Sequence, residues 1–134
     1  MRRPIVVEML SRQYPDVNFI IPHLGGFADD WITHLQVIDM LTRHPNVYGD
    51  TSGVRYWGIL VQAVRRAGPC KLLFGSDGPL PHPALELRKI TLLGLPPSQE
   101  ALITGGNILR LLDQSGSDLP SGGGRRPRRS IPVR

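Results

Sequence analysis

Residues 71–79 read KLLFGSDGP, and this stretch decides how the rest of the chain is interpreted. The apolar run at 72–74 is typical of a buried strand, because strands of parallel sheets are covered on both faces. Gly75 follows, and then Asp77 where the strand should end. An acid at the end of a buried strand suggests a functional site.

Two earlier stretches have the same plan. In NFIIPHLGG (18–26) an apolar run leads to His23, and in NVYGDTSG (46–53) a second run leads to Asp50. The spacing is regular, with 27 residues from His23 to Asp50 and 27 from Asp50 to Asp77, about the length of one strand-plus-helix unit. We therefore expect three parallel strands joined by helices, with all three polar side chains at the same edge of the sheet.

Helices are expected around these strands. Apolar residues recur at helical spacing, and prolines and glycines punctuate the pattern, in segments 4–14, 29–44, 54–68 and 83–93, followed by short helices at 98–103 and 107–112. Asp29 and Asp30 are expected at a helix N-terminus, and Asn107 is expected to be an N-cap. Trp57 is predicted to lie in the core.

Length and composition bound the class of protein. The chain has 134 residues, 40% of them hydrophobic, enough for one modest globular domain with a core. No apolar run approaches the ~18 residues of a membrane span, and the N-terminus lacks a signal-peptide pattern, so we expect a cytoplasmic protein without a membrane partner. A single cysteine, Cys70, excludes an internal disulfide, and its place beside an apolar strand predicts a buried structural thiol.

The formal net charge of +5 belongs mainly to the C-terminus. Residues 115–134 hold five arginines against one aspartate, a net +4, which leaves +1 for residues 1–114. This Gly-, Pro- and Arg-rich segment has almost nothing to bury, so we expect a disordered tail after a folded domain of residues 1–114. The arginines could contact phosphates, but no aromatic residue interleaves them for base stacking, so nucleic acid is not the expected partner.

Residues 4–113 resemble the C-terminal part of metal-dependent enzymes related to the amidohydrolases. YPD (14–16) followed by FIIPHLGG (19–26) is similar to the sixth strand of those barrels, with its His-x-Gly end. NVYGDTSG (46–53) is similar to the seventh strand, LLFGSDGP (72–79) to the eighth, and GNILRLL (106–112) to the closing helix. The subgroup suggested contains aminocarboxymuconate-semialdehyde decarboxylase with related decarboxylases and hydrolases. The resemblance implies an α/β fold that is a partial TIM (β/α)8 barrel, the last three parallel strands with their helices.

The resemblance also implies a divalent-metal site, usually zinc, acting on a small-molecule substrate. Asp77 would be a metal-binding carboxylate, and His23 would lie beside the metal-bound water as a second candidate ligand; both are candidate catalytic residues. The structural alternatives are a carboxylate that caps the turn at 78–79 and an imidazole packed in a loop. Asp50 is expected to be structural, and Arg55 either meets a substrate carboxylate or is solvated. The other histidines, His34, His44 and His82, are expected to be packing or surface residues.

The sequence departs from that family in its ligands. The His-x-His pair of the first strand and the metal-binding histidine of the fifth have no counterpart here, whereas a catalytic zinc ordinarily has three protein ligands. One hypothesis is therefore a segment of a metal-dependent hydrolase or decarboxylase that is inactive alone and needs a missing N-terminal half. The alternative is a non-catalytic remnant or interaction module of the same fold. Either would leave apolar surface exposed and favour self-association or a partner.

Overall fold

The computed structural model describes residues 5–26 and 30–117 of the chain. Helices and strands alternate through most of this length, as the sequence predicts. In chain order the elements are α1 (Ile5–Gln13), β1 (Phe19–Ile21), η1 (Pro22–Gly25), α2 (Trp31–Arg43), β2 (Val47–Asp50), α3 (Trp57–Ala67), η2 (Pro69–Lys71), β3 (Leu72–Leu73), α4 (Pro83–Thr91), α5 (Pro97–Ala101), η3 (Leu102–Gly106) and α6 (Asn107–Ser117).

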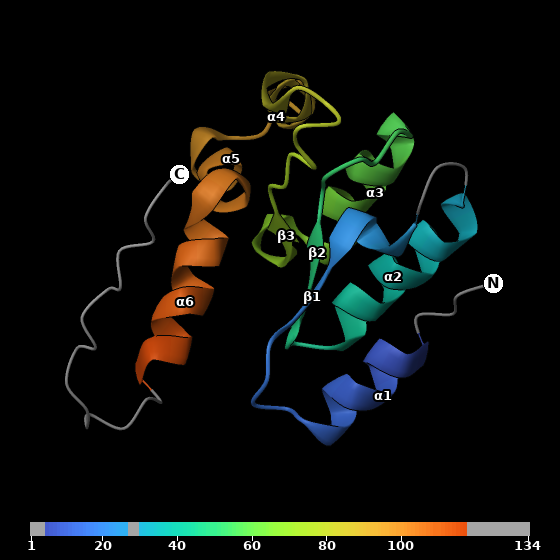
Figure 1. Cartoon of the computed structure of the whole chain (residues 1–134), viewed down its shortest axis with the longest axis vertical. Helices are drawn as coiled ribbons and strands as arrows, with labels where there is room; N and C mark the ends of the chain where they lie inside the picture. Colours follow the sequence, from blue (N-terminus) through green and yellow to red (C-terminus); the bar gives the residue numbers. More distant parts are fainter. Residues whose placement is uncertain (1–4, 27–29, 118–134) are drawn as a thin grey trace, which may run out of the picture.

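The three strands form one parallel sheet in the order β1-β2-β3 (Figure 1). Phe19 pairs with Val47 and Ile21 with Gly49, while Asp50 at the end of β2 pairs with Leu73. Because all three strands run in the same direction, the segments that follow them leave the sheet at one edge. The predicted arrangement of strands and crossover helices is therefore confirmed.

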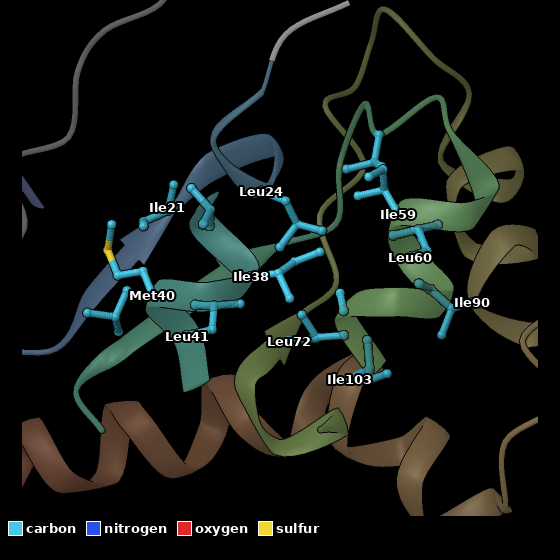
Figure 2. Close-up of a cluster of buried hydrophobic side chains, with 14 residues drawn as sticks. Ile21, Leu24, Ile38, Met40, Leu41, Ile59, Leu60, Leu72, Ile90 and Ile103 are labelled. Atoms are coloured by element: carbon cyan, nitrogen blue, oxygen red, sulfur yellow. The ribbon is translucent and has the colours of Figure 1, made fainter. Parts of the chain in front are cut away.

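Helices cover both faces of this sheet (Figure 1). One face packs with α2 and α3 in the main core, which includes Ile21, Ile38, Leu41, Leu60 and Leu72 (Figure 2). Side chains of successive strand residues point to opposite faces, so Tyr48 and Leu73 point the other way and form a second cluster with Leu111 of α6. No helix within residues 5–26 and 30–117 is long and apolar enough to cross a membrane.

Asp30 lies at the N-terminus of α2, as the sequence predicts, and the structure shows that it is the N-cap. Asp30 accepts hydrogen bonds from the backbone nitrogen of Thr33 at 3.1 Å and from its hydroxyl at 2.6 Å. Both bonds lower the pKa of the Asp30 carboxyl, and the bond from the Thr33 hydroxyl has the larger effect. Asp29 lies outside the described residues.

Asn107 is not an N-cap, and that prediction was wrong. The chain stays helical from α5 through η3, a π-helical segment, into α6, and Asn107 has helical φ and ψ of −67° and −45°. Its side chain is fully buried and donates from Nδ2 to the carbonyl oxygens of Pro69 and Leu72, both at 2.8 Å. The residue therefore ties α6 to the start of β3. Gly105 and Gly106 do not interrupt the helix, because the segment is held by the buried Ile103, whose carbonyl oxygen accepts from the backbone nitrogen of Phe74, and this packing overrides their low propensity.

Two other packing predictions were wrong. Cys70 is exposed, because it lies in the short η2 turn ahead of β3 and not in the strand. Trp57 is 43% exposed, since α3 presents Ile59, Leu60 and Ala63 to the core instead. Helix α6 runs to Ser117, three residues into the range of the expected tail, and the rest of that range, 118–134, lies outside the described residues.

Lys71 joins β3 to the connection between α2 and β2. Its ammonium donates to the carbonyl oxygens of His44, Pro45 and Val47 at 2.7–3.0 Å, and it lies 4.7 Å from the centre of the Tyr48 ring. Burial lowers the pKa of the Lys71 amine. These bonds fix where β2 begins relative to β3, and so where the loops after both strands emerge.

Candidate active site beyond the carboxyl ends of the strands

The turn after β1 presents His23. His23 and Leu24 have φ of 55° and 45°, in the left-handed region that residues with a side chain seldom adopt. The turn is anchored to the core and to α2, because Leu24 is fully buried and its carbonyl oxygen lies 3.2 Å from His34 Nδ1. A side chain on Gly26 would collide with the His34 ring. Backbone strain maintained by packing in this way is common at functional sites.

The imidazole of His23 has a defined orientation. Its Nδ1 lies 3.0 Å from the carbonyl oxygen of Ser52 and 3.0 Å from the Ser52 hydroxyl oxygen. A carbonyl oxygen can only accept a hydrogen bond, so the contact with Ser52 favours the tautomer with the proton on Nδ1 and the lone pair on Nε2. This is the tautomer in which a histidine binds a metal or takes a proton through Nε2.

Asp77 lies in the loop between β3 and α4, with a φ of 51°. Its side chain is exposed, and the backbone nitrogen of Gly78 donates to the Ser76 hydroxyl at 3.3 Å. The acceptor that closes this turn is therefore the Ser76 hydroxyl oxygen, which weakens the alternative in which Asp77 is the capping residue.

Gly53, in the loop after β2, lies between His23 and Asp77. A Cβ placed on Gly53 would be 3.2 Å from His23 Nδ1 and 3.6 Å from Asp77 Oδ2. Three loops that follow three parallel strands therefore meet at this point. The structure brings the two predicted site residues together, as the even spacing in the sequence implies.

Asp50, the third strand-end residue, holds the backbone. Its Oδ1 accepts a hydrogen bond from the backbone nitrogen of Ser52, and a side chain on Gly75 would collide with its carboxylate. Asp50 thus links the loop after β2 to the segment after β3, in the structural role expected of it.

An open cavity of about 560 Å³ lies beside His23 and Asp77. That volume is within the range of pockets for small organic ligands. Val54, Leu80 and Pro81 supply its apolar wall, and charged groups of both signs supply the rest. The described residues that line it do not include Asp50; they are His23, Gly53, Val54, Arg55, Asp77, Leu80, Pro81, Glu86 and Lys89.

Two of the lining residues, Glu86 and Lys89 on α4, were missed by the sequence reasoning. Glu86 is 7% exposed; its Oε2 accepts a hydrogen bond from the backbone nitrogen of Gly53 at 3.1 Å and lies 2.6 Å from Lys89 Nζ. The same ammonium donates to the carbonyl oxygen of Val54 at 2.9 Å. One feature of the sequence could have indicated that Glu86 is buried: it lies four residues before the buried Ile90 and so shares its helix face.

The remaining histidines behave as packing or surface residues. His34 is buried under the first loop, and burial lowers the pKa of its imidazole. His44 is buried between the Ser11 hydroxyl and Glu8. His82 accepts a hydrogen bond from the backbone nitrogen of Ala84 as the N-cap of α4.

The residues present fit part of a metal centre. A carboxylate and a neutral imidazole are ligands that zinc and manganese accept, and Asp77 and His23 offer one of each at the cavity. Among residues 5–26 and 30–117, however, no group of three His, Cys, Asp or Glu side chains could hold a metal ion. A catalytic zinc takes three protein ligands, so the described part of the chain supplies fewer than such a centre needs.

Parallel strands with crossover helices, and polar residues gathered beyond their carboxyl ends, form an α/β arrangement of the kind that also builds (β/α)8 barrels. The sequence profile of the amidohydrolase family matches residues 1–114. The chain therefore belongs to the amidohydrolase family. No protein with a curated function matches the chain.

Solved structures share this fold. One is 5-carboxyvanillate decarboxylase from Sphingomonas paucimobilis, with a TM-score of 0.60 and 20% identity over 81% of this chain and 37% of that one. Another is dihydroxybenzoic acid decarboxylase from Polaromonas sp. with bound manganese and the inhibitor 2-nitroresorcinol (0.59 and 19%, over 79% and 36%). A third is an amidohydrolase from Burkholderia multivorans with bound zinc (0.62 and 17%, over 78% and 46%).

These similarities confirm the predicted fold, a partial α/β barrel of the amidohydrolase type. At identities of 20% or less they show the fold alone. The chain spans between 36% and 46% of the length of these three structures.

Proposed function

We propose that this chain supplies part of the active site of a metal-dependent hydrolase or decarboxylase that acts on a small organic substrate. The observation that carries the proposal is the approach of His23 and Asp77 to the same point beside Gly53, at the wall of the cavity. Membership of the amidohydrolase family supports it. The manganese and zinc bound in two structures of similar fold support a divalent metal as cofactor, and zinc is our first candidate.

Each side chain has a proposed task. Asp77 would bind the metal through its carboxylate, and His23 would present Nε2 either to the metal or to the proton of the attacking water. A divalent ion, when bound, supplies Lewis acidity and lowers the pKa of water. Arg55, which is exposed at the cavity wall, would pair with an anionic group of the substrate.

The chain alone is proposed to have no turnover. Two ligands hold a divalent ion loosely, and the geometry that activates water is absent without a third. The remaining ligands would come from another polypeptide segment, either an N-terminal half-barrel or another copy of the chain. An edge strand offers unpaired backbone groups to such a partner, and Ile20 on β1, at one edge of the sheet, is 45% exposed.

A second candidate is a non-catalytic interaction module of the same fold. It is favoured by one observation, that the described part of the chain contains no three-ligand cluster. The two candidates differ in one expectation: only the first requires the Asp77 carboxylate for catalytic activity of the complex with a partner.

The test is to purify the chain alone and after co-expression with the N-terminal half-barrel of a related decarboxylase, and then to assay decarboxylation of 5-carboxyvanillate and dihydroxybenzoates. We expect activity only in the complex, and its loss in Asp77→Asn but not in Asp113→Asn, an exposed aspartate on α6. A stable complex without activity on these acids or on ester and amide substrates would favour the interaction module. Turnover by the unaided chain would contradict the proposal.

A further inference from the structure

We infer that Glu86 and Lys89 are positioning residues, which hold the loop after β2 so that this loop in turn fixes the orientation and tautomer of His23. The inference rests on the proposed function only in taking His23 as a site residue. Its evidence is a series of hydrogen bonds that starts on α4, passes through the peptide unit between Ser52 and Gly53, and ends at the imidazole ring.

The series begins at a partly buried ion pair. Lys89 Nζ lies 2.6 Å from Glu86 Oε2, and the two side chains are only 23% and 9% exposed. Each partner also bonds to the backbone of the loop: Glu86 accepts from the nitrogen of Gly53 at 3.1 Å, and Lys89 donates to the carbonyl oxygen of Val54 at 2.9 Å. One helix therefore holds consecutive residues of the loop through a donor and an acceptor.

The loop transmits this constraint to the imidazole. Ser52 precedes Gly53, and its carbonyl oxygen and hydroxyl both lie 3.0 Å from His23 Nδ1. The direction of the Ser52 carbonyl is set by the peptide unit that it shares with the Gly53 nitrogen, because that unit is planar. The hydrogen bond from Gly53 to Glu86 thus fixes the orientation of the group that keeps the proton on His23 Nδ1.

Stability alone does not account for an ion pair at this place. Taking charges out of water carries a desolvation cost, and a well-packed apolar pair often serves stability equally well. Both residues also line the cavity that His23 and Asp77 border. Their location favours a role in holding the site's geometry, as residues that support a metal-binding or catalytic histidine do.

The test reads the His23 tautomer directly, in the metal-free chain, by ¹⁵N NMR of labelled histidine at one fixed alkaline pH. His23 signals are assigned by their loss in His23→Gln. The variants are Lys89→Met, which removes the bond to Val54, and Glu86→Ala, which removes the bond to Gly53. Glu86→Gln keeps an acceptor oxygen for Gly53, and Arg88→Met is the matched control, an exposed cation on the same helix.

We expect the Nδ1–H form to predominate in the wild type, in Arg88→Met and, by rescue, in Glu86→Gln. In Lys89→Met and Glu86→Ala we expect it to fall to a minority, with the Nε2–H form taking its place. Backbone amide spectra establish that each variant is folded; if Glu86→Ala is not, Lys89→Met decides. An unchanged His23 tautomer in the folded variants, or an Nε2–H form in the wild type, would overturn the inference. Neither the ¹⁵N signals nor the amide spectra require metal or turnover. A failure of this inference can therefore be distinguished from a failure of the proposed function, which is tested by activity.

Discussion

Gly53 faces the ring of His23 so closely that a Cβ on Gly53 would lie 3.2 Å from His23 Nδ1. Gly53 also has a φ of +62°, which a residue with a side chain adopts at a cost of roughly 1–3 kcal/mol. We predict that Gly53→Ala lowers the free energy of unfolding by about this amount and displaces the imidazole. Urea denaturation measures the first effect, and the ring proton signals of His23 measure the second.

Gly94 provides the matched control. Its φ is +64°, but a Cβ there would meet nothing within 4 Å. Gly94→Ala should therefore show a similar loss of stability and leave the His23 signals in place. Equal shifts of the His23 signals in both variants would mean that contact with Gly53 does not position the ring.

Asn107 is predicted to be a major stabilising residue. Asn107→Ala would remove the side-chain donor from the buried carbonyl oxygen of Leu72 and one of the two donors to the carbonyl oxygen of Pro69, which also accepts from the backbone nitrogen of Leu72. We expect a loss of roughly 2–3 kcal/mol in the free energy of unfolding, because unsatisfied buried groups retain their desolvation cost. The exposed Asn18 is the control, and Asn18→Ala should change stability by about 0.5 kcal/mol or less. Equal effects of the two substitutions would contradict the role assigned to Asn107.

His34 should make stability depend on pH. Burial lowers the pKa of its imidazole in the folded chain, so below about pH 6.5 the unfolded chain binds a proton that the folded chain does not. Stability should therefore fall as pH falls through this value, until the folded form is protonated too. The slope from this residue is at most about 1.4 kcal/mol per pH unit.

The measurement is the free energy of unfolding between pH 8 and pH 5 for the wild type and for His34→Asn. Asparagine keeps an N–H near the position of Nδ1 for the carbonyl of Leu24, but it does not titrate. The variant should lose part of the pH dependence seen in the wild type. Identical pH profiles would show that His34 does not carry the predicted linkage.

The parts of the fold that follow from local patterns were predictable. The apolar runs before His23, Asp50 and Asp77, with their even spacing, indicated three parallel strands and a shared edge, because strand direction and alternation follow from chain order. Pro83 likewise marked the first turn of α4, and Asp30 marked the N-terminus of α2.

What the sequence did not reveal depends on contacts between distant segments. Asparagine is a residue type that often caps helix N-termini, yet the partners of Asn107, Pro69 and Leu72, come from another part of the chain. Glu86 and Lys89 look like ordinary surface charges of an amphipathic helix until α4 is packed against the loop after β2. Side chains whose role is set by tertiary hydrogen bonds carry no periodic signal. The bonds from Glu86 to Gly53 and from Lys89 to Val54 were therefore found only in the structure.

The central claim is that His23 and Asp77 form an incomplete divalent-metal site. The most direct measurement is zinc and manganese binding to the purified chain, by elemental analysis and calorimetric titration, with Asp77→Asn, His23→Gln and the control Asp113→Asn. We predict that elemental analysis finds far less than one tightly held ion per chain. Titration with added metal should reveal one weak binding site, which is lost in Asp77→Asn and in His23→Gln and kept in the control. One tightly held zinc per unaided chain, or weak binding that survives Asp77→Asn, would contradict the account.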